Sequence, residues 1–178
     1  MLKIFAVIGA VLVAGVTVVL ILAVMKPDQF RVSRSAAIKA PPEKIFPLIN
    51  DFKAWTAWSP YENKDPAMKR TYGSSTSGKG ATYAWEGNSN VGAGNMWITD
   101  APAPSKLTLE LNMAKPIEAH NIVDFTLVPA GDTTTVTRVM RGEAPYFAKI
   151  IHVFFNMDKM VGGDFEAGLA KLKATAEK

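Results

Sequence analysis

Few residues in this chain have the type and spacing of a catalytic centre. The two histidines, His120 and His152, have no second histidine or carboxylate at a metal-binding spacing such as His-Glu-x-x-His. Ser59 has no histidine near it in the sequence and is not part of a Gly-x-Ser-x-Gly turn. The absence of cysteine excludes disulfides, thiolate metal ligands and cysteine nucleophiles. The sequence therefore predicts no metal and no cofactor, identifies no catalytic residue, and favours a function other than catalysis.

Arg138 is the charged residue with the most unusual predicted position. It shares strand parity with Val136 and Met140, whose side chains should face the protein interior. A buried guanidinium group is costly unless it is paired. We therefore expect Arg138 to bind a carboxylate or phosphate of a ligand, or to pair with Glu86 or Glu118. The alternative is a β-bulge that turns Arg138 to solvent.

Aromatic and methionine side chains could line a cavity for an apolar ligand. Tyr83 and Trp85 share a strand face, and the segment from Trp55 to Tyr61 should lie at one mouth of the domain. Flexible methionines suit an apolar ligand of irregular shape. Large aromatic residues also fill protein cores, so that alternative stays open for each of them. The candidate ligand-binding residues are Trp55, Trp58, Tyr61, Tyr83, Trp85, Met113, Phe125, Arg138, Met157 and Met160.

The elements that must position these residues are strands followed by a long helix. Phe30 to Ala40 alternates as a first strand, and Pro41-Pro42 begins a short helix. Gly131-Asp132 is the best hairpin signal. From residue 147 to 173, apolar residues recur close to a 3.6-residue period, which predicts one C-terminal helix with a kink or weak point at Gly162-Gly163. The other predicted strands are Met68 to Gly73, Ala81 to Gly87, Gly92 to Thr99, Lys106 to Met113, Ala119 to Pro129 and Thr133 to Gly142.

Several motifs occur in the order found in a known superfamily. They are Ile-x-Ala-Pro-Pro-Glu-x-Ile-Phe from Ile38, Trp-x-x-Trp-Ser-Pro-Tyr-Glu from Trp55, Tyr-x-Trp-x-Gly-Asn from Tyr83, Thr-Thr-Thr-Val-Thr from Thr133 and Met-Asp-Lys-Met-Val-Gly from Met157. Together they resemble the bacterial SRPBCC or START-like superfamily, in its branch of polyketide cyclases, dehydrases and lipid transport proteins. The resemblance implies an α+β helix-grip fold, in which a curved antiparallel sheet of about seven strands surrounds a long C-terminal helix. It also implies a cavity between sheet and helix that takes lipids, polyketides or other apolar molecules.

The N-terminal segment is typical of a membrane anchor. Ile4 to Met25 is a run of 22 residues without a charge, and it ends without an Ala-x-Ala cleavage pattern. We expect residues 1–26 to form a single-pass transmembrane anchor and residues 27–178 to form the START-like domain. Basic residues on both sides of the anchor leave its orientation open, but long domains translocate largely regardless of charge. We expect the domain on the extracytoplasmic side.

The net charge of +4 is spread along the chain without a basic cluster, so we expect no nucleic-acid partner. The leading hypothesis is a membrane-anchored domain that binds a lipid or other hydrophobic small molecule, with the bilayer as a further partner. One alternative is a non-catalytic accessory subunit of a larger complex of membrane proteins. The other is a polyketide cyclase- or dehydratase-like enzyme, which needs an acid or base inside the cavity.

Overall fold

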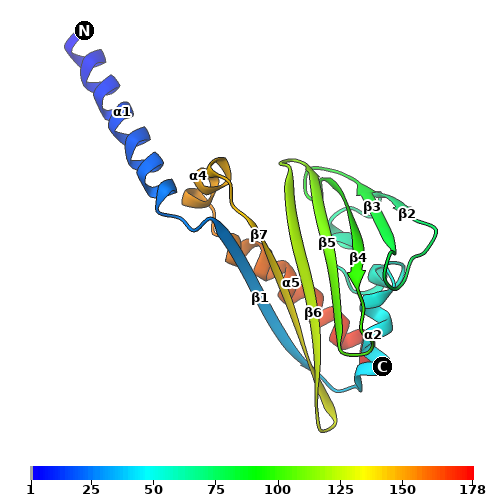
Figure 1. The fold of residues 1–178 in the computed structure, drawn as a ribbon. Coiled ribbons are helices and arrows are strands. Elements are labelled where there is room, and N and C mark those ends of the chain that lie inside the picture. The colour runs from blue at the N-terminus through cyan, green and yellow to red at the C-terminus, as the bar shows by residue number, and fades with distance from the viewer. Residues whose placement is uncertain (1) are drawn as a thin grey trace.

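The computed structural model describes residues 2–178, which form a long N-terminal helix followed by an α+β domain (Figure 1). Helix α1 (Leu2–Val24) leads through four residues into the domain. The domain comprises β1 (Gln29–Ile38), α2 (Pro42–Asn50), the 3-10 helix η1 (Ala54–Ala57), α3 (Tyr61–Lys64), β2 (Lys69–Tyr72), β3 (Thr82–Glu86), β4 (Ala93–Asp100), β5 (Lys106–Lys115), β6 (Ala119–Ala130), β7 (Thr133–Glu143), α4 (Tyr146–Phe154) and α5 (Met157–Ala176).

The strands form one antiparallel sheet of seven strands in the order β1-β7-β6-β5-β4-β3-β2. Each strand begins and ends within two residues of the bounds predicted from the sequence. Gly131 adopts a φ of +65° in the two-residue turn between β6 and β7, which confirms the predicted hairpin. The pairing of β4 with β5 shifts register between Ala93 and Gly94, which bends the sheet there.

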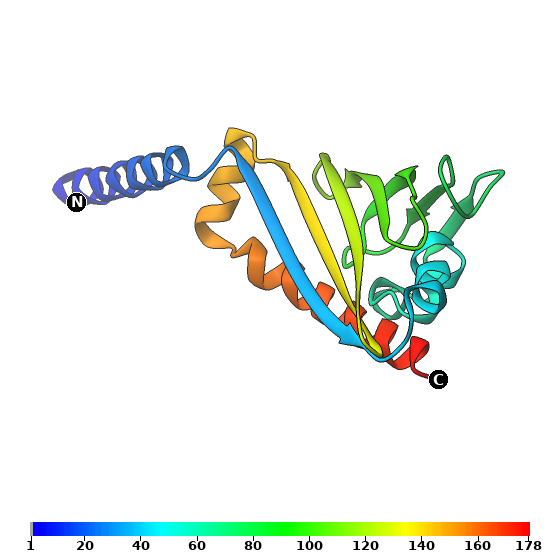
Figure 2. The ribbon, with the colours of Figure 1, turned by 60° about the horizontal axis from the view of Figure 1, so that its bottom comes forward.

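One face of the sheet is apolar because every second residue of the central strands is aliphatic or aromatic. Leu107 and Leu109 of β5, Val123 and Phe125 of β6, and Val136 of β7 are all buried. Helix α5 runs along this inner face below β1 and β7 (Figure 2), and its Phe165, Leu169 and Leu172 complete the core. The arrangement of a curved sheet around the C-terminal helix is the predicted helix-grip fold.

The C-terminal helical segment is divided at a different place from the one predicted. The chain is extended at Phe155, and α5 begins after Asn156, whose side chain accepts a hydrogen bond from the backbone N–H of Lys159 at 3.0 Å. Gly162 and Gly163 lie inside the uninterrupted α5. The predicted kink at the two glycines is therefore wrong, because the break is set by the cap at Asn156.

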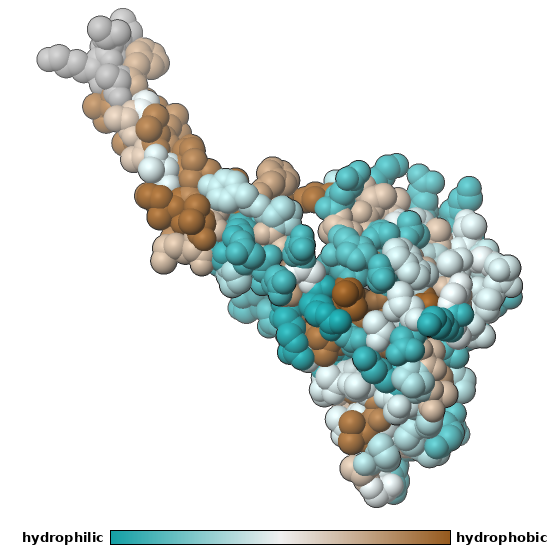
Figure 3. Space-filling model, viewed as in Figure 1, coloured by the Kyte–Doolittle hydropathy of each residue, from teal (hydrophilic) through white to brown (hydrophobic). Residues whose placement is uncertain are grey.

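Helix α1 projects away from the domain, and its apolar surface is open along its length (Figures 1 and 3). Val7–Val24 is long and apolar enough to cross a membrane, and 6% of this window is buried. An N-terminal signal sequence can meet the same criteria of length and composition. The domain contact of α1 is made at its C-terminal end, where it packs against α4.

Candidate functional site: a buried arginine beneath the sheet

Arg138 lies on the inner face of the sheet. β7 pairs with β1 and β6 in unbroken register, which places Arg34 and Phe125 opposite Arg138 on the two neighbouring strands. Because no bulge interrupts either pairing, Arg138 faces the same side as Val136 and Met140. Its side chain is only 7% exposed. The alternative interpretation, a bulge that turns Arg138 to solvent, is therefore wrong.

Aromatic rings surround the guanidinium group of Arg138. Its central carbon lies 4.0 Å from the ring centroid of Phe165, 5.3 Å from that of Phe125 and 5.9 Å from that of Trp55. Within residues 2–178, Arg138 forms no hydrogen bond or ion pair, and its buried Nε has no partner. Cation–π contacts contribute about 0.5–2 kcal/mol, less than the several kcal/mol lost when a charge leaves water. Burial lowers the pKa of Arg138 to about 10, so the group still carries its charge at neutral pH.

Acidic side chains are not placed to neutralise this charge directly. Glu86 and Glu118, the predicted partners of Arg138, are both exposed to solvent, and Glu86 lies 3.5 Å from Lys115 Nζ. The prediction that one of them pairs with Arg138 is therefore wrong.

Tyr61 and Asp164 are the ionisable groups whose charges act on Arg138. Asp164 accepts hydrogen bonds from Lys64 Nζ at 2.7 Å, so its carboxylate already has a charged partner. Burial raises the pKa of Tyr61 to about 12, so its hydroxyl stays protonated at neutral pH. Arg138 thus has a neutral phenol and an already paired carboxylate near it.

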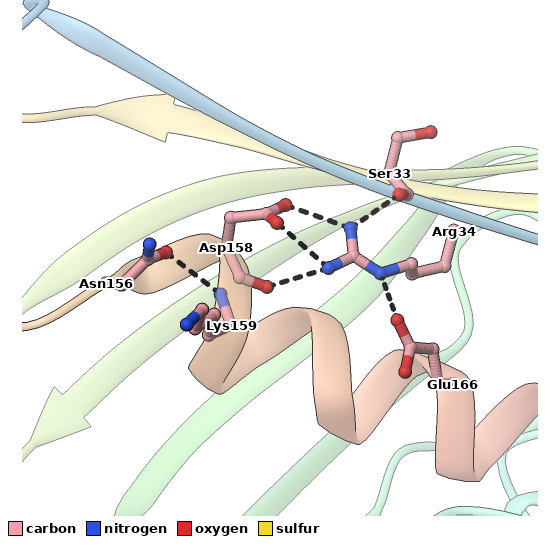
Figure 4. Close-up of polar contacts among 6 residues, drawn as sticks. All are labelled: Ser33, Arg34, Asn156, Asp158, Lys159 and Glu166. Carbon is pink, nitrogen blue, oxygen red and sulfur yellow. Dashed lines mark hydrogen bonds and ion pairs between the residues drawn. The ribbon is translucent and has the colours of Figure 1, made fainter.

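Arg34, the cross-strand neighbour of Arg138, shows how the same fold pairs an arginine fully (Figure 4). Its guanidinium group donates to both carboxylate oxygens of Asp158 at 2.9 Å and to Glu166 Oε1 at 2.5 Å. These hydrogen bonds raise the pKa of Arg34 above its ordinary range. Both acids belong to α5, so Arg34 fastens this helix to β1.

A second unsatisfied polar atom lies on the same inner face. Asn121 of β6 is buried, and its Oδ1 has no hydrogen-bond partner in residues 2–178. It is four residues from Phe125, the neighbour of Arg138, which corresponds to about 13 Å along the strand. Val123 and Met140 pair with each other between these positions. Two unpaired polar groups therefore flank an apolar strip of the sheet. Strand parity with Val123 would have placed Asn121 inward from the sequence alone.

Comparison with known proteins identifies the family. Residues 29–177 match the family described as polyketide cyclase / dehydrase and lipid transport. The chain belongs to this family. No curated protein matches the sequence.

Solved structures with the same fold extend over nearly the whole START-like domain. Protein CV1439 from Chromobacterium violaceum aligns with a TM-score of 0.61 and 14% identity over 86% of this chain and 99% of its own. Protein MLL2253 from Mesorhizobium loti aligns with a TM-score of 0.58 and 17% identity over 82% of this chain and 98% of its own. The Aha1 dimer from Colwellia psychrerythraea aligns with a TM-score of 0.57 and 16% identity over 83% of this chain and 96% of its own. At these identities the likeness shows the fold alone.

Trp55 and Trp58, two of the three candidate tryptophans, lie in the core of the domain rather than at a mouth. Trp55 and Trp58 are buried, and their indole N–H groups donate to the backbone carbonyls of Ile49 at 2.9 Å and Leu48 at 2.8 Å. These bonds fix η1 against α2. Phe125 is fully buried, 6.1 Å from Trp58 between ring centroids. The predicted mouth position of the tryptophans is wrong because α2 supplies carbonyl partners that draw both indoles inward.

Tyr83, Trp85 and Met113 follow the inner face toward the open end of the sheet. Tyr83 is buried and stacks on Trp85 with ring centroids 6.0 Å apart, while Trp85 and Met113 are half-buried. Trp85 donates its indole N–H to the carbonyl of Val91 at 3.0 Å. A Cβ at Gly94 would lie 2.7 Å from the Trp85 ring, so the glycine lets the indole lie flat on β4.

The methionines of α5 occupy a different environment. Met157 is half-buried and Met160 is 56% exposed, so Met160 does not line the interior. Phe165, one turn further along α5, makes the close contact with Arg138 instead. This long-range pair has no signal in the sequence.

Within residues 2–178, neither of the two hollows best formed in the structure is the expected cavity between the sheet and α5. The two most clearly formed hollows of the described residues lie at the surface, one of about 350 Å³ beside η1 and the end of α5, the other of about 400 Å³ at the β5–β6 turn. Trp58, Phe125 and Phe165 fill the space between sheet and helix. The prediction of a preformed hollow is therefore wrong for this conformation, and a ligand at Arg138 would have to displace core side chains.

His120, His152 and Ser59, the residues considered first for catalysis, each make contacts that serve the fold. His120 faces the solvent side of β6, and its Nδ1 lies 2.6 Å from Asn112 Oδ1. His152 packs edge-on against Phe30 with ring centroids 6.3 Å apart. Ser59 closes η1, since its backbone N–H donates to Trp55 O at 2.8 Å.

Proposed function

We propose that this protein is a membrane-tethered START-like domain that binds a lipid or other hydrophobic small molecule carrying an acidic group. The observation that carries the proposal is Arg138, a buried cation without a partner on the face that the family's fold presents to its interior. Buried polar groups are almost always hydrogen-bonded, so an unpaired guanidinium group calls for a partner that comes from outside the chain. A carboxylate or phosphate matches the guanidinium fork in shape and charge.

The apolar residues around Arg138 indicate what the rest of the ligand should be like. Phe125, Phe165 and Met140 offer only hydrocarbon, ring faces and sulfur next to Arg138. Asn121, about 13 Å away on β6, has an amide oxygen free to accept one hydrogen bond. An amphiphile with an acidic group, an apolar body and a second polar group satisfies both. Entry requires Phe165 and the adjoining turns of α5 to move away from Arg138.

The tether explains how such a molecule is reached. Helix α1 is long and apolar enough to span a bilayer, and only four residues separate it from β1. A domain held this close to the bilayer samples molecules that are dissolved in it.

The test is the content of the purified full chain. Wild-type protein, Arg138→Met and Arg141→Met are extracted from membranes in mild detergent and measured by native mass spectrometry and by organic extraction. Arg141 is the matched control because it lies on the same strand but faces out and binds Asp124. We expect an acidic amphiphile in the wild type and in Arg141→Met, and about 10-fold less of it in Arg138→Met, since a hydrogen bond to a charged group contributes ~1.5–3 kcal/mol.

Equal content in all three proteins, or an empty wild type, would contradict the proposal. The filled interior favours a second function in that case, a non-catalytic accessory subunit of a membrane complex. Its signature is a second membrane protein that co-purifies in stoichiometric amount with an empty domain.

A further inference from the structure

Helix α4 (Tyr146–Phe154) lies where the domain meets the N-terminal helix. Tyr146 donates its hydroxyl to the carbonyl oxygen of Leu20 at 3.2 Å. Ala23, in the last turn of α1, is fully buried, and α4 is the element against which α1 packs. Figure 1 shows α4 at the end of the domain from which α1 emerges. The position of α4 is thus tied to that of α1.

One face of α4 is committed to the domain. Lys149 is buried and bonds to Asp28 in the segment between α1 and β1. His152, one turn later, packs edge-on against Phe30. Burial beside the charge of Lys26 lowers the pKa of His152, so this face presents a neutral imidazole to Phe30 at neutral pH.

The opposite face of α4 is apolar and open. Phe147 is 64% exposed and Phe154 is 67% exposed, and these positions are seven residues apart. Ile150 and Ile151, half-exposed, lie between them at helical spacing. Phe155 and Met160 extend the exposed apolar surface past the end of the helix. We call this surface, from Phe147 to Met160, the α4 stripe. Within residues 2–178, its phenylalanines and Met160 are left more than half exposed.

Such a surface is unfavourable in water. Burying one large apolar side chain contributes ~1.5–3 kcal/mol, and the stripe leaves two phenylalanines of one helix face mostly exposed together. An amphipathic helix with this pattern is typical of segments that lie in the plane of a membrane interface. The apolar surface of α1 runs down to the point where that helix meets the domain (Figure 3).

We propose that the α4 stripe is a membrane-docking surface, which inserts into the headgroup and acyl boundary of the same bilayer that α1 spans. The inference rests on the membrane tether of the proposed function. The Tyr146–Leu20 hydrogen bond sets the depth of α4 in the bilayer relative to α1. Leu20 lies four residues before the end of α1, which corresponds to about 6 Å along the helix axis. Interfacial helices bury their apolar face to a depth of ~5–10 Å, so α4 reaches the required level while α1 is fully inserted.

The surrounding residues fit this depth. Tyrosine is enriched at the membrane interface, where its ring lies in apolar surroundings and its hydroxyl remains hydrogen-bonded. Lys26 follows α1 directly and is exposed, so its ammonium group lies at the level of the lipid phosphates. Docking through α4 gives the domain a fixed orientation on the bilayer, with the N-terminal end of α5 toward the lipid and the β6–β7 hairpin away from it.

The absence of cysteine allows a direct test with single spin labels. Val13→Cys, Phe154→Cys and Val128→Cys variants of the full chain are labelled with a nitroxide. Each is reconstituted alone, at low protein-to-lipid ratio, in vesicles of phosphatidylcholine and phosphatidylglycerol. A nitroxide in lipid collides often with oxygen, and a nitroxide in water collides often with a water-soluble nickel chelate. The two collision rates therefore give the position of each label relative to the bilayer. Val128, 58% exposed near the β6–β7 turn, is the matched apolar control.

We expect the label at position 13 to be deep in hydrocarbon, the label at 154 at a shallow depth and protected from nickel, and the label at 128 fully accessible to nickel. A label at 154 as accessible to nickel as that at 128, with the label at 13 in lipid, overturns the docking surface and leaves the tether intact. A label at 13 in water overturns both. Protection at 154 that comes with spin–spin broadening shows a second copy of the chain on the stripe, and it also overturns the proposal.

Discussion

Arg34 and Arg138 face each other across β1 and β7, yet only Arg34 is paired, through Asp158 and Glu166 of α5. Two like charges side by side on one sheet face repel each other unless at least one is neutralised. The two acids of α5 satisfy Arg34 and leave Arg138 with ring faces alone. The unpaired cation lowers the stability of the empty domain.

Arg138→Met should therefore stabilise the empty full chain. Removing an uncompensated buried charge while keeping side-chain volume is expected to raise the free energy of unfolding by about 1–4 kcal/mol. Urea denaturation of the detergent-solubilised protein, followed by tryptophan fluorescence, measures this change. Arg141→Met serves as control and should lower stability by at most ~1 kcal/mol, because its pair with Asp124 is exposed on the arginine side.

The difference in free energy of unfolding between Arg138→Met and the wild type should also depend on pH. The pKa of Arg138 is lowered to about 10 in the folded chain by burial, so the unfolded chain binds more protons above that pH. The free energy of unfolding of the wild type should therefore increase as the pH rises past 10, because the buried charge is lost. The difference in free energy of unfolding between Arg138→Met and the wild type should shrink between pH 9 and 11. An advantage of Arg138→Met that stays constant between pH 9 and 11 would show that the pKa of Arg138 is not lowered into this range.

At the scale of elements, the break between α4 and α5 and the continuity of α5 depend on contacts that sequence distance hides. Gly162 lies inside α5 because the helix approaches β1 closely there, and a Cβ at this position would lie 2.1 Å from Arg34 Nη2. Gly163 has open space where its Cβ would be. The two adjacent glycines thus have different roles.

Gly163→Ala should raise the free energy of unfolding by about 0.5–1 kcal/mol, the usual gain from alanine in a helix interior. Gly162→Ala has the same intrinsic gain but forces the guanidinium group of Arg34 away from Asp158, so it should lower stability. Thermal unfolding followed by circular dichroism separates the two variants. If both are stabilising, Arg34 can shift at no cost and does not fasten α5 to β1.

These contacts also show what the sequence could and could not reveal. Strand bounds, the Gly131-Asp132 hairpin and the inward position of Arg138 follow from period-two alternation and turn chemistry, which are local properties. The burial of Trp55 depends on a carbonyl of α2, and the aromatic ring nearest to Arg138 belongs to Phe165 of α5. Such pairings arise only when the elements pack, so the filled interior and the place of the helix break could not be predicted.

At the scale of the whole molecule, the N-terminal helix is joined to the domain by a short connection and by a packing contact. α1 is 23 residues long, leaves the domain through four residues and packs its last turn on α4. Its open apolar surface has no partner in residues 2–178 beyond that contact. The proposed docking of the α4 stripe requires that α1 remains attached and spans the bilayer.

Val13→Asp tests the anchor at its centre, because Val13 is the middle residue of α1. A carboxylate at this depth costs about 2.5–3.5 kcal/mol of insertion free energy, whereas Val13→Leu keeps the helix apolar. The expected result is that the wild type and Val13→Leu stay in the membrane pellet after washing at alkaline pH, while a large share of Val13→Asp is released or fails to accumulate. The intact mass of the mature wild type should include residues 1–25. A mature chain that starts near Lys26 would identify α1 as a cleaved signal sequence and would overturn both the tether and the membrane-docking surface.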